Sequence, residues 1–263
     1  MAVYDWKSFL MPYEQAVDEL KVKLRSIRKE YRRRNEYSPI EFVTGRVKEV
    51  SSLLEKANKF NIPFDRVRYE MEDIAGIRIM CQFVDDIDTV VGLLRARKDM
   101  SILYEKDYVA NVKESGYRSY HIIFKYPVNM VDGPIEILGE FQIRTLSMNF
   151  WATIEHSLNY KYKQQIPPEI QDKLKLAADA AFNLDEQMLD IKDEIKDAQK
   201  LFEVKSDIIS NIMSRILTLH SLGKIAESSR YEIVLNKLIE DGEVWELTNL
   251  LQAINKDIDK YRD

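Results

Sequence analysis

Apolar residues near the amino terminus recur at alternating steps of three and four. The positions are Leu10, Tyr13, Val17, Leu20, Leu24, Ile27 and Tyr31. Because an α-helix has about 3.6 residues per turn, this spacing places all of them on one side of a helix. The pattern predicts a long amphipathic helix with one buried face.

A second helix is predicted to begin at Ser38, with Pro39 in its first turn, because serine caps helices and proline suits their first turn. Its apolar stripe is expected at Val43, Val47, Val50, Leu54 and Ala57. Pro63 marks the loop after this helix.

From Gly76 onward the pattern changes to runs rich in β-formers. The predicted strands are 77–83, 101–109, 121–126 and 135–144, and the predicted helices are 85–98 and 145–162. A turn over 128–134, with Asp132 and Gly133, favours an antiparallel hairpin between the last two strands. The order predicts an α/β (α+β) fold, in which helices pack on a mixed sheet.

After Pro168 the chain is expected to be helical to its end. One stripe keeps a 4-3 spacing over several heptads: Ile170, Leu174, Ala177, Ala181, Leu184, Met188, Ile191, Ile195, Ala198 and Phe202. This spacing is typical of a coiled-coil seam and favours self-association, although a helix lying along the sheet domain is the alternative. We expect one domain over residues 1–205 and a helical extension over 206–263. The extension carries a further stripe at Val244, Leu247, Leu251, Ile254, Ile258 and Tyr261.

Composition narrows the possible classes of protein. With 45% apolar and 32% charged residues among 263, the chain is expected to form a packed core. A net charge of −5 argues against a general nucleic-acid coat protein, although residues 21–34 hold eight basic residues and one acidic residue. The single cysteine, Cys81, indicates no disulfide framework. Without an apolar run near the ~18 residues of a membrane span, we expect a cytoplasmic protein.

Two acidic residues are candidates for chemistry. Asp73 and Glu140 are placed at the edges of separate predicted strands, where side chains of neighbouring strands converge. Two such carboxylates can hold one Mg²⁺ ion, and one of them could accept a proton from an attacking hydroxyl. The alternative is that each is a helix cap or a surface charge.

Basic and hydroxyl residues on the second predicted helix could bind a polyphosphate. Lys48, Ser52 and Lys56 lie four residues apart and would line one face, with Arg46 close by. A triphosphate needs several donors at once. The alternative is an ordinary solvated helix face.

A glycine-hinged loop could bind a nucleotide base. Gly116 allows a tight backbone, and Tyr117 could stack on a base that Asn149 would help to select. His121 and Lys161 could pair with phosphate. The alternatives are a half-buried tyrosine ring and a histidine with satisfied hydrogen bonds in the core.

Five motifs in this order resemble the RelA/SpoT-type alarmone synthetases, and especially the small single-domain, RelQ-like members from Gram-positive bacteria. They are TGRVK (44–48), DIAGIR (73–78), ESGYRSYH (114–121), EFQIRT (140–145) and WATIEH (151–156). The resemblance covers residues 1–205. It implies a nucleotidyltransferase-like mixed sheet and a role in stringent-response signalling. The implied reaction transfers pyrophosphate from ATP to the 3′-hydroxyl of GDP or GTP and releases AMP.

The resemblance also implies roles for individual residues. Arg46 and Arg78 correspond to the arginines that sandwich the adenine of ATP. The implied contacts to the ATP phosphates are Lys48, Ser52, Lys56 and Arg118. Asp73 and Glu140 correspond to the Mg²⁺ ligands, and Glu140 also to the base for the 3′-hydroxyl. The implied contacts to GDP or GTP are Tyr117 and Asn149 at guanine, and Lys113, His121 and Lys161 at the 5′ phosphates.

The bifunctional relatives carry a hydrolase built around a His-Asp pair. Here the histidines are His121, His156 and His220, and none precedes an aspartate, so no alarmone hydrolysis is expected. The sequence leaves open the choice between GDP and GTP.

For assembly, the resemblance implies a homotetramer with a central cleft that binds the product, pppGpp or ppGpp, and raises activity. The matching positions are Lys21, Arg25, Arg28, Phe42 and Thr44. Arg25 stands where a lysine is frequent. The alternative is a solvated basic face or one that binds single-stranded RNA. For the whole chain, the alternatives are a toxin-like transfer of pyrophosphate to the tRNA 3′ end and an inactive RNA-binding scaffold.

Overall fold

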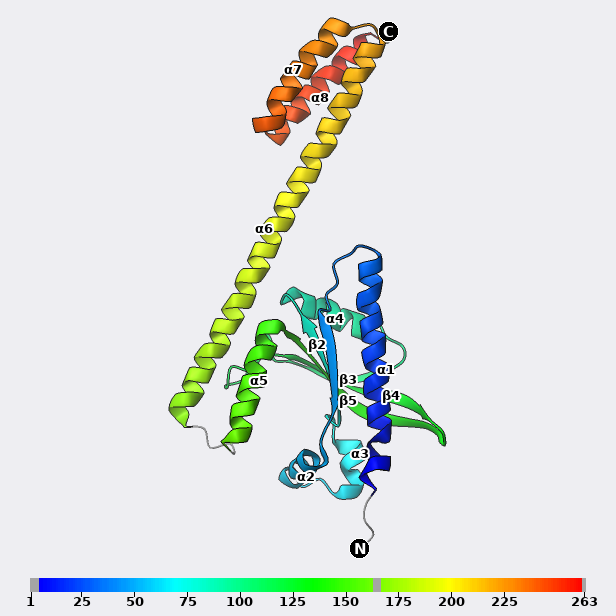
Figure 1. Cartoon of the computed structure of the whole chain (residues 1–263), viewed down its shortest axis with the longest axis vertical. Helices are drawn as coiled ribbons and strands as arrows, with labels where there is room; N and C mark the ends of the chain where they lie inside the picture. Colours follow the sequence, from blue (N-terminus) through cyan, green and yellow to red (C-terminus); the bar gives the residue numbers. More distant parts are fainter. Residues whose placement is uncertain (1–4, 163–166, 262–263) are drawn as a thin grey trace. The chain divides into compact units, whose positions relative to one another are not determined.

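The computed structural model describes residues 5–162 and 167–261 (Figure 1). The chain divides into two compact units, one ending at Leu189 and the other beginning at Asp190. Helix α6 (Pro168–Ser221) contributes residues to both units. The expected functional boundary near residue 205 stays a prediction.

The first unit is built on a five-stranded mixed sheet, which confirms the predicted fold class. Its strand order is β1 (Phe42–Val47), β2 (Ala75–Cys81), β5 (Gly133–Thr145), β4 (Tyr120–Met130) and β3 (Ser101–Asp107). Strands β2 and β5 are parallel, and every other neighbouring pair is antiparallel.

Helices bury one face of this sheet. They are α1 (Trp6–Arg33), α2 (Val50–Lys59), the short η1 (Phe64–Arg66), α3 (Val67–Glu70) and α4 (Asp85–Arg95). Figure 1 shows α1 lying along the sheet, and its predicted stripe is confirmed at Tyr13, Val17, Leu20 and Leu24, all buried. Successive strand residues point to opposite faces, so Ile77 and Ile79 enter this core while Gly76 and Arg78 face the other side.

The second predicted helix is wrong in its first half. Residues Phe42–Val47 form strand β1, and the helix begins only at Val50. The Ser38 hydroxyl accepts a hydrogen bond from Ile40 N (3.2 Å) in a turn instead of capping a helix. Antiparallel pairing with β2 satisfies the backbone of this segment, an interaction that local spacing does not reveal. On α2 the buried residues are Leu53 and Ala57, whereas Leu54 is exposed.

The hairpin is confirmed, but its strands are longer than expected. Met130 pairs with Gly133, so only two residues form the turn and the strands extend into the predicted 128–134 segment. Gly133 has φ +117°, a conformation that disfavours residues with a Cβ. Glu140 therefore lies in the middle of β5, not at a strand edge as predicted.

Helix α5 (Leu146–Lys161) follows β5, and Thr145 caps it by accepting a hydrogen bond from Met148 N (3.1 Å). The first turns of α6 pack beside α5, where Trp151 Nε1 donates to Leu174 O (2.7 Å) and Ala178 is buried. Most of the predicted seam lies on a different face: Leu184, Met188, Ile191 and Ile195 are exposed. Within the first unit, Leu174 packs against the Trp151 cluster while Leu184 and Met188 are exposed, and the use of the seam in self-association stays a prediction.

The second unit is helical, as predicted. Helices α7 (Ile225–Asp241) and α8 (Val244–Lys260) pack with the end of α6 around a core of their own (Figure 1). Ile212, Tyr231 and Ile254 are among its buried residues. In the part of the chain described here, no helix has both the length and the apolar character needed to cross a membrane.

Candidate active site

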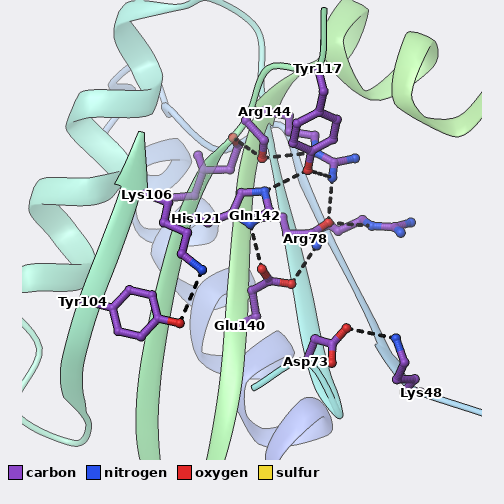
Figure 2. Close-up of polar contacts among 12 residues, drawn as sticks. Lys48, Asp73, Arg78, Tyr104, Lys106, Tyr117, His121, Glu140, Gln142 and Arg144 are labelled. Carbon is purple, nitrogen blue, oxygen red and sulfur yellow. Dashed lines mark hydrogen bonds and ion pairs between the residues drawn. The ribbon is translucent and has the colours of Figure 1, made fainter. Parts of the chain in front are cut away.

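The uncovered face of the sheet carries the polar residues. Arg78 of β2 lies opposite Gln142 of β5, and Gln142 lies opposite His121 of β4. In the adjacent row, Gly76 of β2 lies opposite Glu140 of β5. Because residues opposite one another point to the same face of a sheet, the register brings these side chains together. Figure 2 shows the side chains of Arg78, His121, Glu140 and Gln142 converging over the middle strands.

Asp73, just before β2, is held by two lysines. Lys48 Nζ and Lys56 Nζ each lie 2.9 Å from Asp73 Oδ2. Lys48 follows β1, not a helical face as predicted, and its backbone N donates to Ile74 O (2.8 Å), which places it beside Asp73. Burial alone would raise the pKa of Asp73, but the two lysines outweigh it and hold that pKa below its usual value.

Glu140 receives hydrogen bonds on both carboxylate oxygens. His121 Nδ1 donates to Oε1 (2.7 Å), and Gln142 Nε2 donates to Oε2 (2.8 Å). Burial would raise the pKa of Glu140, but these donors hold it below its usual value. Glu140 is therefore an ionised carboxylate in a fixed orientation at neutral pH.

One small cavity joins the two carboxylates to two arginines. Its lining is Arg46, Asp73, Gly76, Arg78, Glu140 and Gln142. A Cβ added to Gly76 would make only ordinary van der Waals contact with the Arg46 side chain (3.9 Å). Burial and the neighbouring Arg46 charge lower the pKa of Arg78. Gathered like charges of this kind favour an anionic ligand.

Residues of the segment around Gly116, from Lys113 to His121 and called the acceptor loop below, also gather near Glu140. Tyr117 Oη lies 2.7 Å from His121 Nε2, and Lys113 Nζ lies 4.8 Å from the centre of the Tyr117 ring. Both ring nitrogens of His121 are therefore engaged by side chains. Burial, with the charges of Lys106 and Arg144, holds the pKa of Lys113 below its usual value against the opposing charge of Glu140.

Other predicted site residues lie apart from the cavity. Arg118 turns toward α6, where Nη2 lies 3.0 Å from Asp179 Oδ1 and its guanidinium covers the Phe182 ring at 4.4 Å. Ser52 lies one turn before Lys56 on α2. Asn149 is in the first turn of α5, whereas Lys161 is its last residue, roughly 18 Å further along the helix at 1.5 Å per residue.

The predicted regulatory residues meet at the β1 edge of the sheet. Arg25 Nη2 donates to Val43 O (3.2 Å), and Arg28 pairs with Glu41 (2.8 Å). The stem of Lys21 runs past Gly45, where an added Cβ would come within 3.1 Å of it. Two further predicted residues lie on β1 itself and are exposed, namely Phe42 and Thr44.

Sequence reasoning missed two site residues, Gln142 and Arg144. Arg144 Nη2 donates to Gln142 Oε1 (2.7 Å) and to Tyr117 Oη (2.6 Å). A signal was present, because Glu140, Gln142 and Arg144 alternate with the apolar Phe141 and Ile143 along one strand. That period places all three on one face of β5.

The carboxylates suit a metal that is shared with a ligand. Asp73 Oδ1 is buried and makes no hydrogen bond within residues 5–162 and 167–261. Those same ranges contain no convergent group of three His, Cys, Asp or Glu side chains. One or two carboxylates completed by substrate phosphates are a common set of Mg²⁺ ligands. The residues present therefore fit Mg²⁺ as an ion that binds together with a nucleotide.

The fold and the site define an enzyme domain that binds phosphorylated nucleotides. A family model described as "Region found in RelA / SpoT proteins" matches residues 45–165. The GTP pyrophosphokinase YjbM of Bacillus subtilis is 56% identical over 200 residues, which are 76% of this chain and 94% of that protein. A second B. subtilis protein, GTP pyrophosphokinase YwaC, is 40% identical. The match covers 73% of this chain and 92% of YwaC.

Similar solved structures indicate the same family. The small alarmone synthetase 1 of B. subtilis bound to its product pppGpp has a TM-score of 0.70 and 56% identity, over 72% of this chain and 97% of its own. A GTP pyrophosphokinase family protein from Streptococcus pneumoniae has a TM-score of 0.72 and 53% identity. The match covers 76% of this chain and 98% of the S. pneumoniae chain. The chain therefore belongs to the RelA/SpoT family and, within it, to the small alarmone synthetases.

Proposed function

We propose that this chain is a GTP pyrophosphokinase that makes pppGpp or ppGpp from ATP and GTP or GDP. The observation that carries the proposal is the shared cavity of Asp73, Glu140, Arg46 and Arg78 beside the Tyr117 loop. The family membership and the named activity of its relatives support the same reaction.

In the proposed reaction the 3′-oxygen of the acceptor attacks the β-phosphorus of ATP. The bond from that phosphorus to the oxygen bridging the α- and β-phosphates breaks, AMP leaves, and the hydroxyl proton passes to Glu140. A carboxylate with a pKa below its usual value is unprotonated at neutral pH and ready to accept that proton. Its fixed orientation favours in-line attack.

Arg46 and Arg78 would hold the adenine of ATP, and Lys48 and Lys56 would hold its phosphates. Both lysines now pair with Asp73, and a polyphosphate offers them a stronger anion. Their transfer to phosphate would free Asp73 for Mg²⁺, which supplies charge neutralisation on the phosphates when bound. Ser52 and Arg118 stay proposed phosphate contacts, and Arg118 would first have to leave Asp179.

Tyr117 would stack on guanine, and Lys113 would reach the 5′ phosphates of GDP or GTP. Lys113 and Arg144 both lie over the Tyr117 ring, at 4.8 and 5.1 Å, so the loop already holds cations around the aromatic face. Asn149 as a guanine contact, and His121 and Lys161 as phosphate contacts, stay proposals. For His121 the bonds to Glu140 and Tyr117 favour a linking role instead.

The test is to incubate the protein with ATP labelled at the β-phosphate and Mg²⁺, adding GDP, GTP or deacylated tRNA in separate reactions. We expect label in ppGpp or pppGpp and none in tRNA. Label in tRNA alone would support the toxin-like alternative, and no transfer to any acceptor would support an inactive scaffold. Omitting Mg²⁺ should abolish transfer. Purified product added back should persist, because no hydrolase motif is present.

We also propose that the chain works in the cytoplasm as a homotetramer. The exposed, regularly spaced residues of α6 support self-association, because a heptad stripe of this length needs a partner helix. Ile191, 46% exposed, would be buried in that contact. Light scattering should give a tetramer for wild type and smaller species for Ile191→Asp. A wild-type monomer would contradict the proposal.

Product activation is proposed at the β1 edge, where Lys21, Arg25 and Arg28 gather beside Phe42 and Thr44. Adding pppGpp at the start should raise the initial rate of wild type and leave that of Phe42→Ala unchanged, with a smaller effect from ppGpp because it carries less charge. An unchanged wild-type rate would leave single-stranded RNA as the ligand to test at this basic face.

A further inference from the structure

Gln142 lies at the centre of the polar face, between Glu140 and two arginines (Figure 2). Its Nε2 donates to Glu140 Oε2 at 2.8 Å. Its Oε1 accepts from Arg144 Nη2 at 2.7 Å and from Arg78 Nε at 3.3 Å. Within the described ranges 5–162 and 167–261, every hydrogen bond of this amide is to a residue of the site.

The chemistry of the neighbours allows only one orientation of the amide. A guanidinium has donors and no acceptor, so the amide oxygen must face Arg78 and Arg144. An ionised carboxylate has acceptors only, so the amide nitrogen must face Glu140. Turning the amide over would place donors against donors and oxygen against oxygen. The two arginines therefore fix which atom Gln142 offers to Glu140.

Arg144 is itself held in place. It is 5% exposed, and its Nε donates to Ser119 Oγ (3.2 Å). The same Nη2 that reaches Gln142 also donates to Tyr117 Oη (2.6 Å). Arg144 thus spans the distance between the middle of β5 and the acceptor loop.

These contacts close a ring of five side chains: Glu140, Gln142, Arg144, Tyr117 and His121. Glu140 cannot rotate without breaking a hydrogen bond at each of its oxygens. Through Gln142 the ring also touches Arg78, which lines the ATP side of the cavity. A single amide therefore connects the proposed base with both nucleotide subsites.

We propose that Gln142 is a positioning residue for Glu140, and that Arg144 acts through it by orienting the amide and joining it to Tyr117. The proposal rests on the proposed function, in which Glu140 accepts the proton of the acceptor hydroxyl. A base must lie within hydrogen-bond reach of that proton, and a displacement of about 1 Å can cost ~10²-fold in rate. Loss of the amide should therefore lower kcat more than it raises KM.

The first experiment measures steady-state kinetics of Gln142→Met, which keeps the length of the side chain and removes its hydrogen bonds. We expect kcat to fall ~10–100-fold while KM for ATP and for GDP stays within about threefold. Gln142→Glu should lose at least as much, because a second carboxylate cannot donate to Glu140. Melting temperatures are compared for every variant, since a purely structural role would lower stability together with activity.

Gln82→Met is the matched control. Gln82 Nε2 also donates to a glutamate, Glu41 Oε2 (3.0 Å), but at an exposed position outside the cavity. Its kcat should equal that of wild type in initial rates measured before product accumulates, because Glu41 pairs with Arg28 of the proposed product site. An equal loss of kcat in both glutamine variants would show that replacing any glutamine by methionine has this effect. The loss would then not come from the ring of hydrogen bonds around Glu140.

The second experiment separates the two links of Arg144. Arg144→Met should lower kcat and raise KM for GDP, because it loses both Gln142 and Tyr117. In a Gln142→Met background it should raise KM for GDP but change kcat by less than about threefold, since both substitutions break the same path to Glu140. Arg144→Lys should recover part of the lost kcat, because an ammonium can still donate to Gln142 Oε1.

The outcomes separate the two proposals. A wild-type protein that forms no labelled product overturns the proposed function, and with it the need to position a base. An active wild type with a Gln142→Met kcat within threefold overturns the positioning role alone. A raised KM at unchanged kcat overturns it as well, because Gln142 would then serve substrate binding. Multiplicative losses of kcat in the double variant would refute the claim that Arg144 acts through Gln142.

Discussion

Asp73 and Glu140 line the same cavity, but the protein holds them in different ways. Asp73 lies before a strand, and two flexible lysines share one of its oxygens while the other stays buried without a partner among the described residues. Glu140 lies within a strand, and donors from two strand positions, His121 and Gln142, bind one oxygen each. The first arrangement can exchange partners when phosphate and a cation arrive, whereas the second keeps its geometry. We infer that Asp73 mainly binds metal and that Glu140 mainly serves as the base.

The largest expected effect comes from Glu140→Gln, which keeps the shape of the side chain and removes its charge. Without a proton acceptor, kcat should fall ~10²–10⁴-fold even at saturating Mg²⁺. The measurement is the initial rate of ppGpp formation over a Mg²⁺ series. A rate near that of wild type at high Mg²⁺ would make Glu140 a replaceable metal ligand and remove the distinction from Asp73.

A smaller effect is expected on the acceptor side. Tyr117→Ala should raise KM for GDP, because base stacking on an aromatic ring contributes ~1–3 kcal/mol. Tyr117→Phe should raise KM for GDP much less than Tyr117→Ala, since it keeps the stacking ring and loses only the hydroxyl that contacts His121 and Arg144. Equal defects in both variants would show that the hydroxyl matters, and stacking would then be the wrong explanation.

A third carboxylate, that of Asp185, differs from Asp73 and Glu140 in how it makes stability depend on pH. Asp185 on α6 is buried and accepts hydrogen bonds from Thr145 Oγ1 (2.6 Å) and Ser147 Oγ. Burial raises its pKa, and these hydroxyls do not offset the effect, unlike the donors around Asp73 and Glu140. The protonated group therefore contributes stability that is fully present below the unfolded pKa of about 3.9 and is lost as pH rises through the folded pKa.

Asp185→Asn removes the buried charge, so its free energy of unfolding at pH 7 should match or exceed that of wild type, with a difference of about 1 kcal/mol or less. The advantage should shrink as the pH approaches 4, where wild type becomes protonated. Thermal unfolding of both proteins across this range is the measurement. A variant that is less stable at pH 7 and gains relative stability in acid would contradict the assignment.

Helices with long periodic stripes could be predicted from the sequence, and the strand that borders the site could not. In α1 the apolar period extends from Leu10 to Tyr31, nearly six turns at about 3.6 residues per turn, so local spacing was sufficient. In β1 the spacing of Val43 and Val47 fits both a helix and a strand, and Gly45 between them hides the alternation. Its structure depends on pairing with β2, whose partner residues run from Ala75, opposite Val47, to Met80, opposite Phe42, and are therefore distant in the sequence.

The site was predictable as a set of charged residues but not as a network. Asp73, Glu140, Arg46 and Arg78 share one cavity because of strand order and register, which motif spacing alone cannot provide. Gln142 was missed because a glutamine on a strand carries no charge. Its importance appears only when the fold places two arginines on one side of its amide and a carboxylate on the other.

The most direct test of the account compares the Mg²⁺ dependence of Asp73→Asn and Glu140→Gln in parallel. Asp73→Asn should raise the Mg²⁺ concentration for half-maximal rate by at least ~10-fold, and excess Mg²⁺ should recover much of its kcat. Glu140→Gln should remain slow at every Mg²⁺ concentration. If excess Mg²⁺ restores both variants alike, or neither, the two carboxylates do not have the separate roles that their surroundings indicate.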